Sequence, residues 1–133
     1  NGAVGFLTRI GVPLAGSRVL AVRGRSSGEW RTTPVNPLRV QGMRYLVAPR
    51  GHTQWVKNLR AAGGGELRKG RTAEVFTAVE VADAEKPPIL RAYLTAWAWE
   101  VGRFFDGVDA SSPAEKLREI APDFPVFRIE AAA

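Results

Sequence analysis

Short apolar runs alternate with polar turns along the first half of the chain, a pattern typical of antiparallel strands. The apolar residues 19–22 predict a buried strand, and the polar segment 24–28 predicts the turn after it. Residues 32–40 continue in an extended pattern, where two prolines favour an edge strand or a bulge. Residues 44–48 form a third predicted strand. We expect these three strands to pair as an antiparallel meander.

The spacing of apolar residues then becomes that of a helix, with Thr53 at the position of an N-cap. The apolar stripe of this helix consists of Trp55, Val56, Leu59 and Ala62. The glycines at 63–65 end the helix. A short strand around 66–68 and a long strand over 72–81 are predicted next, joined by a tight turn.

The longest predicted helix covers residues 84–105 and carries one apolar stripe, with Trp99 nearly opposite it. The stripe consists of Leu90, Leu94, Trp97, Val101, Phe104 and Phe105, with Tyr93 at its margin. A further helix is predicted from Ser112-Pro113 to Ala121, and residues 126–129 form a last strand. Ordinary core packing is favoured for Trp97, Phe104 and Phe105, whereas for Trp99, which lies off the stripe, core packing and a substrate wall fit equally well.

The order of these elements predicts an α+β domain that is mainly β. About six mostly antiparallel strands and two to four helices follow one another without βαβ alternation, which favours an antiparallel sheet or a small barrel with attached helices. The 133 residues fit one compact domain over 1–133, in which residues 1–17 form an N-terminal helix or arm.

Composition removes several classes of catalytic site. The chain has no cysteine and a single histidine, His52, so thiolate nucleophiles, iron–sulfur clusters and a metal site with several histidines cannot be built within one chain. We therefore predict no metal site. Chemistry carried by a bound molecule is favoured instead.

The charge is strongly segregated along the chain. Residues 18–71 carry 12 Lys and Arg against two Glu, a net of +10, whereas residues 72–133 have a net of −5. A basic half predicts an anionic partner, which could be a nucleic acid, an acidic membrane surface, or a phosphorylated or polycarboxylate ligand. A merely solvated basic surface is the alternative.

The mostly apolar stretch 2–16 is too short and too interrupted, by Arg9 and Pro13, to cross a membrane. We expect it to be an amphipathic helix that lies on the body of the protein or makes peripheral contact with a membrane. A cytoplasmic location, with or without membrane association, is the corresponding expectation.

Two segments carry candidate chemistry. In residues 24–34, two glycines enclose hydroxyl residues, so backbone N–H groups can point at one anion while Arg25 and Arg31 flank it. An ordinary polar hairpin turn fits the same residues. In residues 48–60, Arg50 follows a predicted strand, and Trp55 and Asn58 share one face of the next helix.

Together the two segments resemble the deazaflavin-dependent nitroreductases, a family of actinobacterial oxidoreductases. The resemblance rests on Gly-Arg-x-Ser-Gly-x-x-Arg-x-x-Pro, a strand ending in a short basic glycine loop, and Trp-x-x-Asn-Leu, in that order. It implies a split β-barrel related to flavin-mononucleotide-binding proteins. It also implies binding of coenzyme F-420, an 8-hydroxy-5-deazaflavin whose tail bears a phosphodiester and an oligoglutamate.

The resemblance assigns a coenzyme role to matching positions. The coenzyme-binding residues would be Arg25, Ser26, Ser27, Gly28, Arg31, Thr33, Pro34, Ala48, Pro49, Arg50, Gly51, Trp55 and Asn58. The first five would grip the phosphate and acidic tail, and Pro49, Arg50 and Gly51 would support the ring and the charge that develops on the acceptor. Substrate walls are expected from Tyr93, Trp97 and Trp99.

The predicted function is hydride transfer from reduced coenzyme F-420 to a small activated acceptor, namely a quinone, a conjugated enone or a nitroaromatic. Two alternatives remain: a basic barrel that binds nucleic acid through Trp30, Tyr45 and Trp55, and a barrel of the same fold that binds flavin mononucleotide (FMN) or haem. We expect no nucleic-acid partner and a monomer or homodimer. His52, in a predicted turn, is not expected to be essential.

Overall fold

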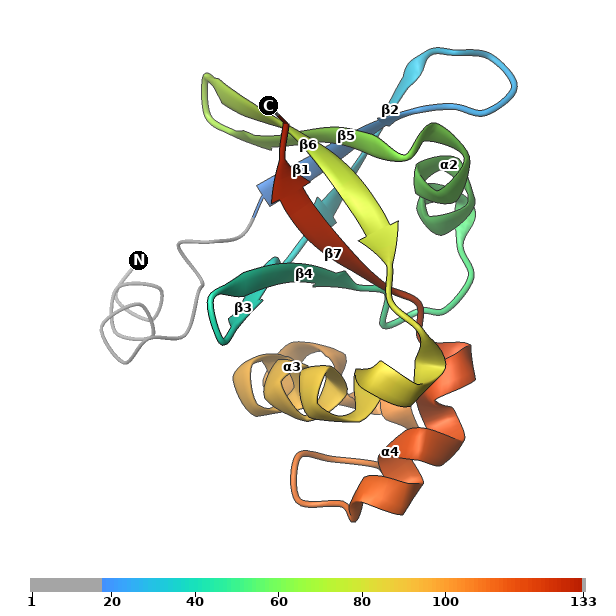
Figure 1. Cartoon of the computed structure of the whole chain (residues 1–133), viewed down its shortest axis with the longest axis vertical. Helices are drawn as coiled ribbons and strands as arrows, with labels where there is room; N and C mark the ends of the chain where they lie inside the picture. The colour runs from blue at the N-terminus through green and yellow to red at the C-terminus, as the bar shows by residue number, and fades with distance from the viewer. Residues whose placement is uncertain (1–17, 133) are drawn as a thin grey trace.

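The computed structural model of the protein describes residues 18–132, so the predicted N-terminal helix or arm and its membrane contact lie outside the described residues. Seven strands form one antiparallel sheet in the order β2-β1-β5-β6-β7-β4-β3 (Figure 1). The strands are β1 (Arg18–Arg23), β2 (Trp30–Val35), β3 (Leu38–Val40), β4 (Met43–Val47), β5 (Gly64–Lys69), β6 (Thr72–Glu80) and β7 (Val126–Ala131). The predicted class, mainly β with attached helices, is confirmed.

The expected antiparallel pairing of successive segments is confirmed, because β1 pairs with β2 and β3 pairs with β4, but the expected continuous middle strand is wrong. Residues 32–40 are split by Asn36 and Pro37 into β2 and β3, which occupy opposite edges of the sheet. The three peptide units from Val35 to Leu38 span at most about 11 Å. The two edges must therefore approach each other, and the sheet curls into a half-open barrel instead of lying flat.

Helix α2 (Gln54–Ala62) lies against β1 and β5 and closes one end of this curl (Figure 1). Its Val56 and Leu59 are fully buried, while the fourth residue of the predicted stripe, Ala62, is exposed. They join an inner core with residues from six of the strands. That core consists of Leu20, Val22, Val35, Leu46, Ala48, Val56, Leu59, Leu67, Phe76, Phe127 and Ile129.

The glycines after α2 do more than end the helix. Strand β5 already begins at Gly64, two residues before the predicted start. A Cβ on Gly65 would lie 2.5 Å from the carbonyl oxygen of Ala21 on the neighbouring strand, far inside van der Waals contact. The close approach of β1 and β5 therefore requires glycine at this position.

Helices α3 (Lys86–Val101) and α4 (Ala114–Ile120) pack together beside β3 and β4 (Figure 1). Short 3-10 turns flank them: η1 (Asp83–Glu85), η2 (Gly102–Phe105) and η3 (Ala121–Asp123). This second core confirms the core positions of Trp97 and Phe105, which are almost fully buried. Within residues 18–132, no helix has the length and apolar character that crossing a bilayer requires.

Phe104 differs from its predicted core position. The α-helix ends at Val101 and continues as the 3-10 turn η2, in which each residue advances by about 120° instead of about 100°. This over-rotation turns Phe104 away from the stripe. Its side chain is only half-buried, whereas Phe105 beside it is buried.

Candidate functional site

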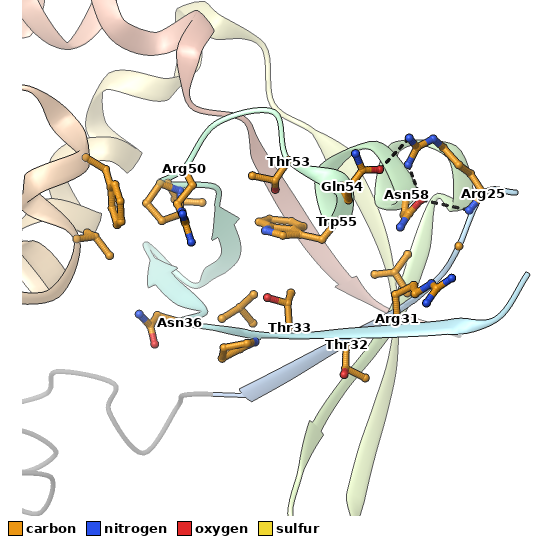
Figure 2. A pocket seen from close by; sticks show the side chains of 18 of the residues that line it. Arg25, Arg31, Thr32, Thr33, Asn36, Arg50, Thr53, Gln54, Trp55 and Asn58 are labelled. Atoms are coloured by element: carbon orange, nitrogen blue, oxygen red, sulfur yellow. Dashed lines mark hydrogen bonds between the residues drawn. The ribbon is translucent and has the colours of Figure 1, made fainter. Parts of the chain in front are cut away.

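A cavity of about 1010 Å³ opens between β2, the loop after β1, the start of α2 and the end of α3. Its volume is at the upper end of the usual range for cofactor and ligand pockets. Figure 2 shows its labelled side chains arranged along β2 and the loop that leads into α2. The two segments that carried the sequence motifs therefore form opposite walls of one cavity.

The loop between β1 and β2 is held by its own backbone. The amide of Gly28 donates to the carbonyl of Gly24 (2.9 Å), and the amide of Gly24 donates to that of Glu29 (2.8 Å). Gly28 has φ +73°, a left-handed conformation that other residues adopt only with strain. Among residues 18–132, the amides of Ser26 and Ser27 find no acceptor, so both remain available to an anion.

Arg25 is anchored to helix α2. Its amide donates to Asn58 Oδ1 (3.1 Å), its Nη1 donates to the same oxygen (2.7 Å), and its Nη2 donates to Gln54 Oε1 (2.9 Å). Asn58 is almost fully buried, and Figure 2 shows it facing Arg25 together with Gln54. Asn58 therefore positions the loop, and the anchored guanidinium keeps its full charge because both acceptors are neutral.

Three other arginines that line the cavity behave differently. The guanidinium groups of Arg31, Arg50 and Arg103 make no ion pair and donate no hydrogen bond to any described residue. The guanidinium carbons of Arg50 and Arg103 lie 5.5 Å and 4.8 Å from the centre of the Phe104 ring. With Arg25, the cavity lining described by the structure holds four arginines against one acidic residue, Glu100, so the cavity attracts anions.

Thr53 and Trp55 line the cavity from the start of α2. Thr53 takes the predicted N-cap position, but its hydroxyl does not cap the helix. That oxygen is buried and has no hydrogen-bond partner. An unsatisfied buried hydroxyl costs free energy, so a polar group bound in the cavity would stabilise it. The half-buried Trp55 packs on Phe127, with ring centres 6.2 Å apart.

A cluster of polar side chains lines the cavity near α3 and consists of Tyr93, Asn36 and Glu100. The Asn36 amide donates to Glu100 Oε2 (2.9 Å). Burial raises the pKa of the Tyr93 phenol far above its usual value; the nearby Glu100 carboxylate adds to this, and a hydrogen bond with Asn36 partly opposes it. Tyr93 is therefore a neutral phenol at physiological pH.

Most predicted site residues meet in this cavity. Those that line it are Arg25, Ser26, Ser27, Arg31, Thr33, Pro34, Pro49, Arg50, Trp55, Asn58 and Tyr93. Gly28, Ala48 and Gly51 do not line it. Trp97 is fully buried in the core formed by α3 and α4, and Trp99 is 63% exposed and does not line the cavity either. The structure thus places both tryptophans away from the expected substrate wall.

Sequence reasoning missed several lining residues. Gln54, Thr53 and Asn36 gave no signal because single polar residues at turns are common. Arg103 and Phe104 were not identified, because they fall at the end of the long predicted helix and its apolar stripe. The change from an α-helix to a 3-10 turn brings them to the cavity. A cationic residue followed directly by an aromatic one, at the end of a long predicted helix, could have drawn attention to this position.

His52 lies outside the cavity lining. Its side chain is exposed, and its Nε2 is 3.0 Å from the carbonyl oxygen of Pro122. Among residues 18–132, no group of histidine and carboxylate side chains could hold a metal ion.

One family model matches most of the chain. Residues 4–105 match the family model described as F420H2-dependent quinone reductase. None of the curated proteins matches the chain.

Solved structures share the fold at low sequence identity. An F420-H2 dependent reductase, FDR-A, has 20% identity and a TM-score of 0.58, with 86% of this chain and 94% of that chain covered. A conserved hypothetical protein of Mycobacterium tuberculosis has 18% identity and a TM-score of 0.58, over 88% and 73%. A Clostridium acetobutylicum protein related to general stress protein 26, of the pyridoxinephosphate oxidase family, has 15% identity and a TM-score of 0.55, over 96% and 84%. The split-barrel fold is confirmed.

Proposed function

Because the chain belongs to the F420H2-dependent quinone reductase family, we propose that it transfers a hydride from reduced coenzyme F-420 to a quinone or another conjugated acceptor bound in the cavity described above. The protein is an oxidoreductase, and its coenzyme is F-420. The observation that carries the proposal is the concentration of four arginines around one large cavity, whose lining residues within 18–132 include a single carboxylate.

The chemistry of the walls fits a coenzyme that combines a flat ring with a phosphodiester and an acidic tail. At one end, the free amides of Ser26 and Ser27 and the guanidinium of Arg31 would bind the phosphate and tail. Arg25 adds a charge whose position is fixed by Asn58. At the other end, Trp55 offers a flat apolar surface, and the unpaired Thr53 hydroxyl would satisfy a polar group of the ring.

When bound, the coenzyme supplies the hydride. The contribution of the protein is to orient the two reactants and to stabilise the negative charge that develops on the acceptor oxygen. Arg50 lies beside the proposed ring position and supplies positive potential there. A quinone that accepts the hydride takes one further proton to become a hydroquinone. His52 lies outside the cavity lining, so we assign that proton to solvent.

The test is a coenzyme titration followed by tryptophan fluorescence, on wild type, Arg31→Gln and Arg71→Gln. Both arginines are exposed, and the side chain of neither makes a hydrogen bond or ion pair within residues 18–132. Only Arg31 lines the cavity, so Arg71→Gln controls for the loss of one unit of charge.

We expect Arg31→Gln to weaken binding at least tenfold, about 1.4 kcal/mol, and Arg71→Gln to leave it within about twofold. Binding should also weaken as the salt concentration rises. Equal losses in the two variants would mean that net charge alone attracts the coenzyme, and the assignment of the anion loop would then be wrong.

A further inference from the structure

We propose that the end of the cavity formed by Arg50, Arg103 and Phe104 binds the acceptor, and that it selects flat acceptors that carry a carboxylate. This inference rests on the proposed function, because it assigns the coenzyme to the opposite end. It concerns the substrate class of the same site.

The first observation is that these cations lack partners. Several arginines outside the cavity are paired with carboxylates: Arg60 with Glu80 (2.7 Å), Arg68 with Glu66 (2.9 Å) and Arg128 with Glu130 (2.8 Å). Arg50 and Arg103 have no such carboxylate among residues 18–132. Glu100, the one acidic residue that lines the cavity within 18–132, accepts a hydrogen bond from Asn36 instead.

The second observation is the aromatic ring that both cations approach. Both guanidinium carbons lie within 5.5 Å of the centre of the half-buried Phe104 ring, which itself lines the cavity. The ring holds the two groups near one place without neutralising them, since a cation–π contact leaves their N–H donors free. An aromatic surface with two free guanidinium groups suits a flat molecule with an anionic substituent.

The third observation is the distribution of charge along the cavity. Arg25 is held by Asn58 and Gln54 at one end, and Figure 2 shows Trp55 lying between these residues and Arg50. The coenzyme tail would use the end with Arg25 and Arg31. The second cationic end is then left for an anion on the other reactant.

The reaction remains balanced for such an acceptor. A hydride brings two electrons and one proton to a quinone ring, one more proton arrives from solvent, and the product is a hydroquinone. The carboxylate takes no part in bond making. Its contact with Arg103 adds binding energy to the substrate and to the transition state alike, so removing Arg103 should raise KM far more than it lowers kcat.

The experiment uses two redox-inert probes of the same shape, 2-naphthoate and 2-naphthamide. Their dissociation constants are measured by calorimetry for the free protein and for the protein saturated with oxidised coenzyme F-420. The variants are Arg103→Gln, Phe104→Leu, and the control Arg118→Gln. Arg118 is exposed on α4, its side chain makes no hydrogen bond or ion pair with another residue in 18–132, and it does not line the cavity.

In wild type and in Arg118→Gln, the naphthoate should bind at least tenfold more tightly than the amide, and in Arg103→Gln the ratio should fall below about threefold. Phe104→Leu should weaken both probes to a similar extent, because it removes the aromatic surface and not the charge. Coenzyme affinity should be unchanged in Arg103→Gln.

Equal binding of the two probes to wild type would overturn the inference. So would a tenfold loss of coenzyme affinity in Arg103→Gln, since that end of the cavity would then belong to the coenzyme. Failure of the proposed function has a different signature: the coenzyme itself would not bind. The probe ratio in the free protein would still decide whether this end recognises a carboxylate.

Discussion

Replacing Asn58 tests how helix α2 positions the anion loop. In Asn58→Leu, two acceptor contacts disappear, one with the amide of Arg25 (3.1 Å) and one with its guanidinium (2.7 Å). The backbone bond is worth about 1 kcal/mol, and the charged one about 1.5 kcal/mol because Arg25 is exposed. We therefore expect a loss of about 2–3 kcal/mol in the free energy of unfolding, which corresponds to a decrease in Tm of about 8–12 °C.

Urea unfolding and a coenzyme titration are measured on three variants. Asn58→Leu should also weaken coenzyme binding at least tenfold, because the loop loses its anchor. Asn58→Asp keeps both acceptors but neutralises Arg25, so its stability should stay within about 1 kcal/mol of wild type while coenzyme binding still weakens. Gln54→Ala removes a single exposed contact (2.9 Å) and should cost less than about 1 kcal/mol.

The reasoning would be refuted if Asn58→Leu changed the free energy of unfolding by less than about 0.5 kcal/mol, the range of an ordinary surface substitution. It would also be refuted if Asn58→Asp bound the coenzyme as tightly as wild type, since the charge of Arg25 would then be irrelevant. A loss of binding in Asn58→Leu without a loss of stability would mean that Asn58 contacts the coenzyme directly.

Four further outcomes are expected. Turnover of His52→Asn should stay within about tenfold of wild type, a barrier change below roughly 1.4 kcal/mol; a thousandfold loss with unchanged coenzyme affinity would make His52 the general acid. Hydrogen bonds from Arg44 to Glu74 and from Arg60 to Glu80 hold the pKa of each carboxyl below its usual range. The stability that these two pairs add is therefore complete above about pH 4.5 and is lost as pH falls. Urea midpoints of Glu74→Gln should depend less on acid pH than those of wild type, and an unchanged dependence would contradict this. Because the pKa of Tyr93 is raised in the folded protein, ionisation of the phenol favours the unfolded state, and stability should fall above about pH 10. Ultraviolet titration of wild type against Tyr93→Phe should show no tyrosinate from Tyr93 before the protein unfolds. Ionisation before unfolding would mean that the phenol is solvated. Coenzyme F-420 should bind at least tenfold more tightly than FMN, about 1.4 kcal/mol, and protein that purifies with tightly held flavin would overturn this preference.

Local patterns predicted the elements well, because hydrophobic period and turn residues act over a few positions. The apolar run at 19–22 predicted β1, and the helical spacing of Val56 and Leu59 predicted α2. The positions of β2 and β3 on opposite edges could not be predicted in this way, since strand pairing in this sheet links residues far apart in the sequence. The prolines indicated an edge but not which edge.

In the candidate site, too, local sequence predicted some features, whereas others depend on contacts between distant residues. The glycines and arginines of residues 24–34 identified the anion loop from local sequence. The hydrogen bonds from Arg25 to Asn58 join residues 33 positions apart, and no local pattern indicates that Asn58 braces this loop instead of facing a ligand. Likewise, the place of Phe104 depends on where an α-helix tightens into a 3-10 turn, which the hydrophobic stripe does not predict.

The most direct test of the central claim is a single-turnover experiment without oxygen, in which protein loaded with reduced coenzyme F-420 is mixed with a naphthoquinone. We predict that the visible absorption of oxidised coenzyme returns much faster with wild type than with buffer alone. Arg31→Gln should reach the same rate only at higher coenzyme concentration, and Arg71→Gln should match wild type. Return of the absorption at the rate seen without protein, under conditions where the coenzyme is bound, would contradict the claim that this cavity carries out hydride transfer.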